Sequence, residues 1–147
     1  MAGQVAGKVA LVTGGASGIG EAVSELLRAE GLTPANLIVI ADDAALPWGR
    51  LRIRERGSAG GHNGLESVIA AVGTTEFLRV RLGIEPPTGR WGDLAEYVLT
   101  PMSAEERRRA ETMVAEAAEA VRLILREGPK RAMTRTNRRA AAPEAEE

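Results

Sequence analysis

The chain has 147 residues, enough for one domain with a buried core, and its 44% hydrophobic and 27% charged residues are typical of a folded protein. It contains no cysteine and one histidine, which excludes disulfides, thiolate catalysis and a multi-histidine metal site. With a net charge of −1, no apolar run of about eighteen residues and no recognisable secretory signal, we expect a cytoplasmic protein without a membrane partner.

The hydrophobic periodicity predicts alternating strands and helices. Strands are expected at residues 9–12, 37–40, 50–54 and 78–84, and helices at 18–29, from about 62, and at 103–127. Val23, Leu26 and Leu27 form the expected apolar stripe of the first helix. This pattern predicts a single α/β domain over residues 1–137 with a mixed, mainly parallel central sheet flanked by helices, followed by a flexible tail at 138–147.

The last predicted helix has the clearest boundaries. Ser103 with Glu106 three residues later forms a capping box, which satisfies free amides at a helix start. Gly128 and Pro129 are expected to end the helix. Its predicted buried stripe consists of Ala110, Met113, Ala117, Val121 and Ile124.

Arginines recur at every second position in two predicted strands. The first set is Arg50, Arg52, Arg54 and Arg56, and the second is Arg79 and Arg81. Because alternate residues of a strand share one face, each set is expected to project from a single face of the sheet. Two such neighbouring strands predict a phosphate-binding patch, since a guanidinium forks two donors onto a phosphate. The alternative is an ordinary solvated sheet face.

A glycine-rich run opens the second predicted helix. Gly60, Gly61 and Gly64 surround His62 and Asn63. Glycines allow a backbone to approach a partner closely, and an asparagine amide can both donate and accept hydrogen bonds. Asp42 and Asp43 follow the strand at 37–40, at the edge where open α/β sheets bind ligands.

From about residue 20 to 137 the sequence resembles bacterial-type peptidyl-tRNA hydrolases. The resemblance is carried by the ordered blocks LIVIADD, LPWGRLRIRERGSAGGHNGLESVIAAVGTTEF, LRVRLGI, EYVLTPMSAEE and KRAMTRTN. It implies a monomeric α/β enzyme that hydrolyses the ester of peptidyl-tRNA, with tRNA as partner and with no cofactor or metal. It also implies that arginines of the two strand faces, namely Arg52, Arg54, Arg79 and Arg81, contact tRNA.

The resemblance assigns roles to individual residues. Family members use a histidine as general base and an aspartate that orients it, a pairing suited to activating water near neutral pH. Asp42 matches the aspartate, and Asn63 matches a substrate-binding asparagine that follows Gly61 in the same loop. A second family asparagine, just before a Ser-Gly pair, aligns with Ser17.

The family's general base has no match in this sequence. It comes from an N-terminal strand and loop that lie upstream of every block matched here. His62 is the only imidazole available, and the family uses that position as part of the glycine-rich loop. We therefore expect Asp42 to have no base to orient and hydrolysis to be weak, with His62 as an alternative base.

Residues 7–20, GKVALVTGGASGIG, resemble a second family, the short-chain dehydrogenase/reductases. Their glycine-rich turn places a pyrophosphate at a helix N-terminus. An active dehydrogenase is excluded, because Tyr97 is followed at the required spacing by Pro101 and not by lysine, and because that fold needs roughly 250 residues. Residues 1–19 are therefore interpreted as an atypical glycine-rich start that serves as scaffold, and no nucleotide cofactor is expected.

Three functional hypotheses follow from the sequence. The first is a peptidyl-tRNA hydrolase family protein with weak or lost activity. The second is a non-catalytic RNA-binding module that uses the arginine face and the loop around Asn63. The third is a non-functional product of gene fusion or truncation, in which a dehydrogenase-like N-terminal segment is joined to part of a peptidyl-tRNA hydrolase.

Overall fold

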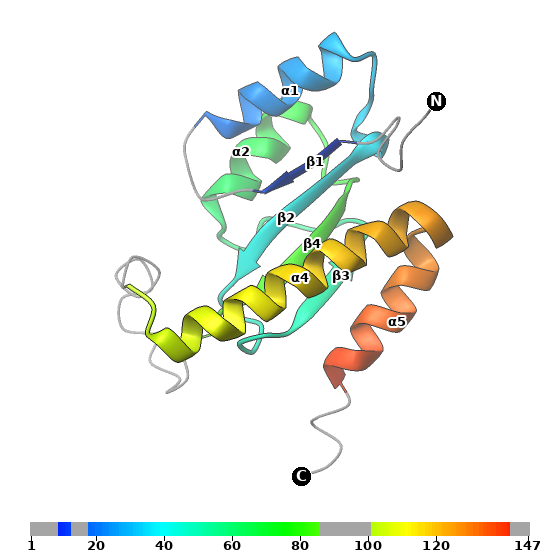
Figure 1. The fold of residues 1–147 in the computed structure, drawn as a ribbon. Coiled ribbons are helices and arrows are strands. Elements are labelled where there is room, and N and C mark those ends of the chain that lie inside the picture. The colour runs from blue at the N-terminus through cyan, green and yellow to red at the C-terminus, as the bar shows by residue number, and fades with distance from the viewer. Residues whose placement is uncertain (1–8, 13–17, 86–100, 142–147) are drawn as a thin grey trace.

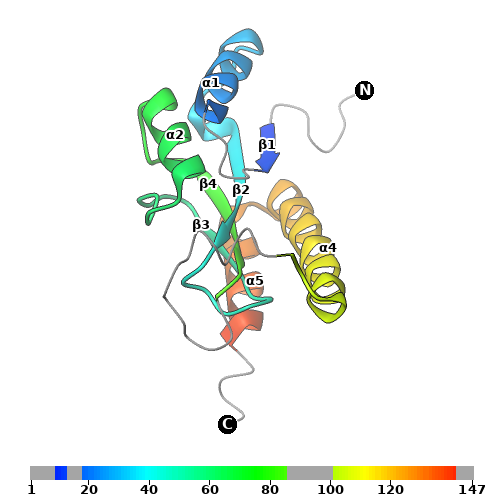
Figure 2. The same cartoon turned by 90° about the vertical axis from the view of Figure 1, so that its left-hand side faces the viewer.

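The computed structural model describes residues 9–12, 18–85 and 101–141. These residues form three layers, with a sheet between two helical layers (Figures 1 and 2). The helices are α1 (Ile19–Ala29), α2 (Asn63–Val72), α4 (Ala104–Glu127) and α5 (Pro129–Ala141), with a short 3-10 helix η1 (Pro34–Asn36). Helices α1 and α2 cover one face of the sheet, and α4 and α5 pack against the other.

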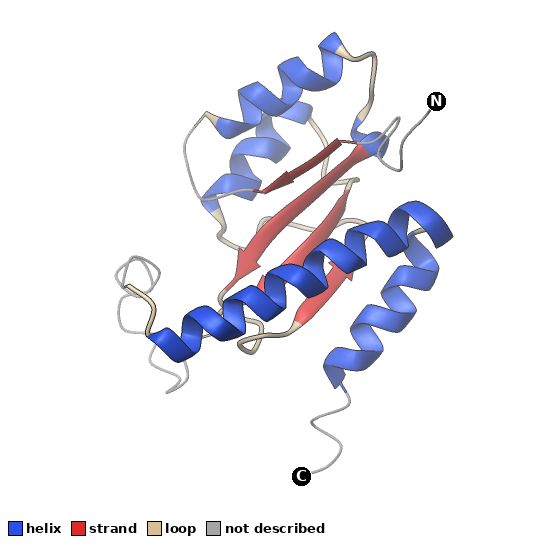
Figure 3. Ribbon diagram, viewed as in Figure 1, coloured by secondary structure: helices blue, strands red, loops and turns tan. Residues whose placement is uncertain are grey.

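The described strands form a four-stranded mixed sheet in the order β1-β2-β4-β3 (Figure 3). The strands are β1 (Val9–Val12), β2 (Leu37–Asp43), β3 (Leu51–Arg54) and β4 (Leu78–Gly83). β1, β2 and β4 are parallel, and β3 runs antiparallel to β4. The predicted α/β fold with a mainly parallel sheet is therefore confirmed, and the carboxyl ends of the three parallel strands meet at one edge.

The two kinds of strand pattern reflect their positions in the sheet. In the central β2, Val39 packs on α1 and α2 while Ile38 faces α4, so the strand is apolar on both sides. In the edge strand β3, Leu51 and Ile53 are buried, and Arg52 and Arg54, which alternate with them, are exposed. Burial on both faces thus explains the continuous apolar run LIVI, and an edge position explains the alternation LRIR.

Helix α1 buries a narrower stripe than the sequence predicts. Val23 and Leu27 are buried, whereas Leu26 is 39% exposed, so the expectation that Leu26 belongs to the stripe was wrong. Consecutive helical residues are rotated by about 100°. The buried row therefore runs through Gly20, Val23 and Leu27, and Leu26 lies outside it.

Helix α4 has the predicted boundaries. The Ser103 hydroxyl accepts from the Glu106 amide at 3.1 Å, and a Glu106 carboxylate oxygen accepts from the Ser103 amide at 2.9 Å. The helix ends at Glu127, before Gly128 with φ of 90°. Met113, Ala117 and Ile124 are buried as predicted, together with Ala120, whereas Ala110 and Val121 are only partly buried.

Helix α5 was not predicted from the sequence. It begins at Pro129, a residue that fits the first turn of a helix, and continues to Ala141, past the expected start of the flexible tail. Its described surface is mostly polar, so it lacks a long apolar stripe. The Asn137 side chain accepts from the Ile53 amide at 2.9 Å and donates to the Ile53 carbonyl at 3.2 Å, which covers the outer edge of β3.

Candidate functional site

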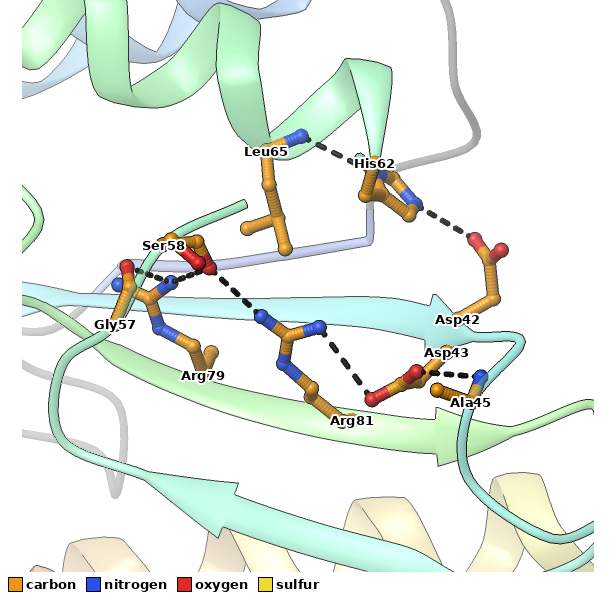
Figure 4. Close-up of polar contacts among 9 residues, drawn as sticks. All are labelled: Asp42, Asp43, Ala45, Gly57, Ser58, His62, Leu65, Arg79 and Arg81. Carbon is orange, nitrogen blue, oxygen red and sulfur yellow. Dashed lines mark hydrogen bonds and ion pairs between the residues drawn. The ribbon is translucent and has the colours of Figure 1, made fainter. Parts of the chain in front are cut away.

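A carboxylate and an imidazole meet at the carboxyl edge of the parallel strands. Asp42 lies at the end of β2, and His62 is the N-cap residue of α2. The Nε2 atom of His62 lies 2.8 Å from Oδ1 of Asp42 (Figure 4). The expectation that Asp42 has nothing to orient was therefore wrong, because β2 and α2 place the only histidine beside it.

Both nitrogens of the His62 ring are engaged. Nδ1 accepts a hydrogen bond from the Leu65 amide at 3.1 Å, which caps the start of α2. An acceptor nitrogen carries no proton, so the proton of the neutral ring lies on Nε2 and is donated to Asp42. In this arrangement neither nitrogen has a free lone pair with which to take a proton from water.

The pair shifts both ionisation equilibria. The hydrogen bond from His62 lowers the pKa of Asp42, although burial acts in the opposite direction. The hydrogen bond to Asp42 raises the pKa of His62 above its ordinary value, while burial and then the charge of Arg81 oppose that rise. The His62 side chain is 11% exposed and the Asp42 side chain 40% exposed, so one side of the carboxylate remains open to solvent or ligand.

The loop before α2 depends on glycine for its conformation. Gly60 and Gly61 have φ values of 59° and 84°, a region that other residues rarely adopt. A Cβ at Gly61 would meet nothing within 4 Å. Glycine is therefore favoured at this position by its positive φ and not by lack of space for a side chain. Asn63, the first residue of α2, is exposed, and its side chain makes no hydrogen bond to the described residues. The Asn63 side chain is thus exposed at the residue that directly follows His62.

The predicted arginine patch is only partly accessible. Arg52 and Arg54 are exposed on β3, directly opposite Arg81 and Arg79 of β4. Arg79 is fully buried, at 0% exposed, so its expected place on an accessible phosphate face was wrong. The reason is position, because β4 lies inside the sheet and the connections before and after α2 enclose the Arg79 guanidinium, whereas β3 is the edge.

Three contacts of Arg81 and Asp43 at this edge were not predicted from the sequence. Arg81 is half-buried and bridges an Asp43 carboxylate oxygen at 3.4 Å and the Ser58 carbonyl at 3.0 Å (Figure 4). Asp43 also accepts from the Ala45 amide at 2.9 Å. In the sequence, Asp43 was visible as a second aspartate after the apolar run of β2. Its partner Arg81 could not be identified there, because that pairing depends on the register between β2 and β4.

The start of α1 is a packing site between two helices. The Gly20 amide donates to the Ser67 hydroxyl of α2 at 3.0 Å, and a Cβ at Gly20 would overlap the Ser67 carbonyl. The Gly20 amide is thus bonded to a side chain of α2, and the scaffold role of residues 1–19 stays a prediction. Ser17, the predicted counterpart of a family asparagine, lies outside the described residues.

The described parts of the chain contain neither a cluster of metal ligands nor a membrane-spanning helix. No group of three or more histidine, aspartate or glutamate side chains there could hold a metal ion. None of the described helices is long and apolar enough to cross a membrane.

Together these features define an α/β domain with a mixed sheet and a carboxylate–imidazole pair at the carboxyl edge of its parallel strands. Residues 17–144 match the family model described as peptidyl-tRNA hydrolase. The chain belongs to the peptidyl-tRNA hydrolase family.

Relatives and solved structures agree with this assignment. A peptidyl-tRNA hydrolase of Koribacter versatilis is 50% identical over 109 residues, covering 74% of this chain and 54% of the relative. The peptidyl-tRNA hydrolase of Solibacter usitatus is 46% identical over 122 residues, covering 82% of this chain and 61% of the relative. The crystal structure of a mutant peptidyl-tRNA hydrolase from Acinetobacter baumannii has a TM-score of 0.71 and 25% identity, covering 80% of this chain and 59% of that chain. This chain therefore spans between about half and two thirds of the length of these proteins.

Proposed function

We propose that the protein binds peptidyl-tRNA in the cytoplasm and slowly hydrolyses its ester bond, releasing peptide and tRNA. Family membership supports the substrate class. The position of Asn63, exposed beside the Asp42–His62 pair at the carboxyl edge of the sheet, supports a substrate site there.

Each accessible residue has a chemical role in this proposal. The Asn63 amide donates and accepts hydrogen bonds to a peptide unit or to the terminal ribose. Arg52 and Arg54 provide charge for tRNA phosphates, since both are exposed and neither forms an ion pair with the described residues. The open side of the Asp42 carboxylate accepts a hydrogen bond from the attacking water.

The two hydrogen bonds of His62 carry the proposal that turnover is slow. A general base needs a free lone pair, and Nδ1 is bound by the Leu65 amide while Nε2 donates to Asp42. Asp42 is a poor base itself, because His62 lowers its pKa. General-base catalysis contributes about 100- to 10,000-fold, so a site without it loses a factor of that size.

Release of peptide from a peptidyl-tRNA by the purified protein tests the proposal directly. We expect slow release that His62→Asn reduces by no more than about threefold, because asparagine also caps a helix and His62 does not accept the proton. Asn63→Ala should raise KM more than it lowers kcat. Rapid release that collapses in both His62→Asn and Asp42→Asn, with the cooperative thermal transition retained, would instead show that His62 is the base.

A non-catalytic RNA-binding module is the second candidate, and the engagement of both His62 nitrogens favours it. It shares Asn63, Arg52 and Arg54 with the first candidate. Binding of peptidyl-tRNA without release above the rate of spontaneous hydrolysis would support this candidate over the enzyme. Failure to bind tRNA at all would exclude both.

A further inference from the structure

The guanidinium of Arg79 is buried in a cage of main-chain carbonyls. Nη1 donates to the Gly57 carbonyl at 2.8 Å and to that of Ser58 at 3.4 Å. Nη2 donates to the Thr75 carbonyl at 2.7 Å and to that of Phe77 at 3.4 Å. The Cζ atom also lies 4.2 Å from the centroid of the Phe77 ring, within cation–π range. Burying a cation destabilises the folded state unless its N–H donors form hydrogen bonds. Here both terminal nitrogens of the guanidinium donate to carbonyls, whereas Nε is buried without a partner among the described residues.

The four acceptors lie in the two connections of α2. Gly57 and Ser58 precede the helix, and Thr75 and Phe77 follow it. One side chain of β4 therefore ties both ends of the α2 segment to the sheet. Arg81, two residues further along β4, donates to the same Ser58 carbonyl at 3.0 Å (Figure 4).

We propose that Arg79 is a positioning residue that holds His62 and Asn63 at the site, an inference that rests on the proposed function. The segment between Arg79's contacts and the helix contains Gly57, Gly60 and Gly61, all with positive φ. Glycine backbone has little conformational preference, so this segment needs an external tether to keep one geometry.

The chain of contacts from the tether to the site is continuous. The guanidinium holds the carbonyls of Gly57 and Ser58, and the next residue, Ala59, is buried. The Ala59 carbonyl accepts from the His62 amide at 3.1 Å, and His62 then caps α2 and meets Asp42. Arginine suits this role because its planar fork reaches carbonyls on two sides, whereas a lysine ammonium is a single point of charge. Burial, followed by the charge of Arg81, lowers the pKa of Arg79 to about 10, so the group is charged at neutral pH.

The substitution Arg79→Lys tests the positioning role. It keeps the positive charge but removes the two guanidinium nitrogens that donate to carbonyls on both sides of α2. His62 is the only histidine, so its ring resonances are unambiguous in NMR spectra. We expect the variant to keep a cooperative thermal transition while the His62 titration midpoint falls toward its ordinary value, because the Asp42 hydrogen bond loosens. For peptidyl-tRNA we expect KM to rise about tenfold with a smaller change in kcat, in the range that misplaced binding groups cause. Arg122→Lys is the matched control, since Arg122 is 53% exposed on α4 and pairs with Glu119.

An Arg79→Lys variant that melts at lower temperature but leaves the His62 titration and KM unchanged would overturn the proposal, because Arg79 would then only stabilise the fold. If Arg79→Lys does not fold, Arg79→Gln decides, because a neutral amide costs less to bury than a cation but cannot reach the carbonyls on both sides of α2. An unchanged His62 titration in that variant also overturns it. The NMR measurement needs no substrate, so it remains decisive even if the protein neither binds nor hydrolyses peptidyl-tRNA.

Discussion

The Nε2 atom of His62 lies 2.8 Å from Oδ1 of Asp42, and this contact joins the N-terminus of α2 to the carboxyl end of β2. A protonated histidine at a helix N-terminus is disfavoured by the helix dipole and here also by the Leu65 amide that points at Nδ1. The hydrogen bond to Asp42 nevertheless raises the pKa of His62, against burial and the charge of Arg81.

The first prediction follows from this pair and concerns the pH dependence of stability. The raised pKa of His62 contributes stability that is fully present below 6.5, its ordinary value, and is lost as the pH rises through the folded-state value. The lowered pKa of Asp42 contributes stability that is present above 3.8, its ordinary value, and is lost as the pH falls through the folded-state value. The pair therefore stabilises the fold most between these two ordinary values.

Urea unfolding of the wild type and Asp42→Asn checks this at about pH 5.5 and about pH 8.5. We expect the free energy of unfolding to differ more between the two proteins at the lower pH. An equal difference at both pH values would show that Asp42 does not raise the pKa of His62 in the folded protein.

The second prediction concerns Asn63. Asn63→Ala should weaken binding of peptidyl-tRNA by roughly 1 to 3 kcal/mol, because the ligand's polar groups would be left without partners. The side chain has no hydrogen bond to the described residues, so urea unfolding should show little change in stability. Isothermal titration with a non-hydrolysable peptidyl-tRNA analogue measures the affinity. Equal affinity of both proteins would remove Asn63 from the site.

The third prediction concerns salt. If Arg52 and Arg54 contact tRNA phosphates, affinity should fall with salt, and the double variant Arg52→Ala, Arg54→Ala should flatten the log–log slope by about 0.7 per lost contact on single strands. Fluorescence anisotropy of labelled tRNA over a salt series measures the slope. Arg122→Ala serves as control because Arg122 is an exposed arginine on α4. Should the double variant keep the wild-type slope, the β3 face is ordinary surface.

The fourth prediction concerns the edge of the sheet. Asn137→Ala removes both hydrogen bonds to the main chain of Ile53, a fully buried residue, and should lower the free energy of unfolding by about 1–3 kcal/mol. Thr134→Ala on the same helix should change it little, since Thr134 is exposed and bonds only the Lys130 carbonyl of its own helix. Chemical denaturation compares the variants. Similar changes in both would show that the hydrogen bonds between Asn137 and Ile53 add no stability beyond that of an exposed helix position.

The fifth prediction concerns the glycine-rich start. Because the Gly20 amide is used by Ser67, we expect no NAD(P)H-dependent turnover and no binding of NAD(H) or NADP(H) in calorimetry. Micromolar binding that Gly18→Val abolishes would reinstate the nucleotide interpretation. Gly20→Ala should destabilise the fold, since its Cβ overlaps the Ser67 carbonyl.

Local patterns predicted the elements whose signals lie within one turn or one strand. The capping box of Ser103 and Glu106 and the apolar run at 37–40 both depend on neighbouring residues, and both are as predicted. Helix α5 was missed because a mostly polar helix has no periodic apolar signal. Its position depends on Asn137, whose hydrogen-bonding partner Ile53 lies 84 positions earlier in the chain.

The sequence by itself determined the strands, most of the helices, the family resemblance and the residues from which the site is made. Only the tertiary structure decided what those residues do. Arg54 and Arg79 share the same alternating pattern, yet one is exposed and the other buried, because β3 is the edge strand whereas β4 is internal and the connections of α2 enclose Arg79. Likewise, Asp42 meets His62 because the parallel pairing of β2 and β4 brings the end of β2 to the start of α2. The solvent exposure of the arginines, the ion pairs and the position of the His62 proton all depend on such contacts between residues far apart in the sequence.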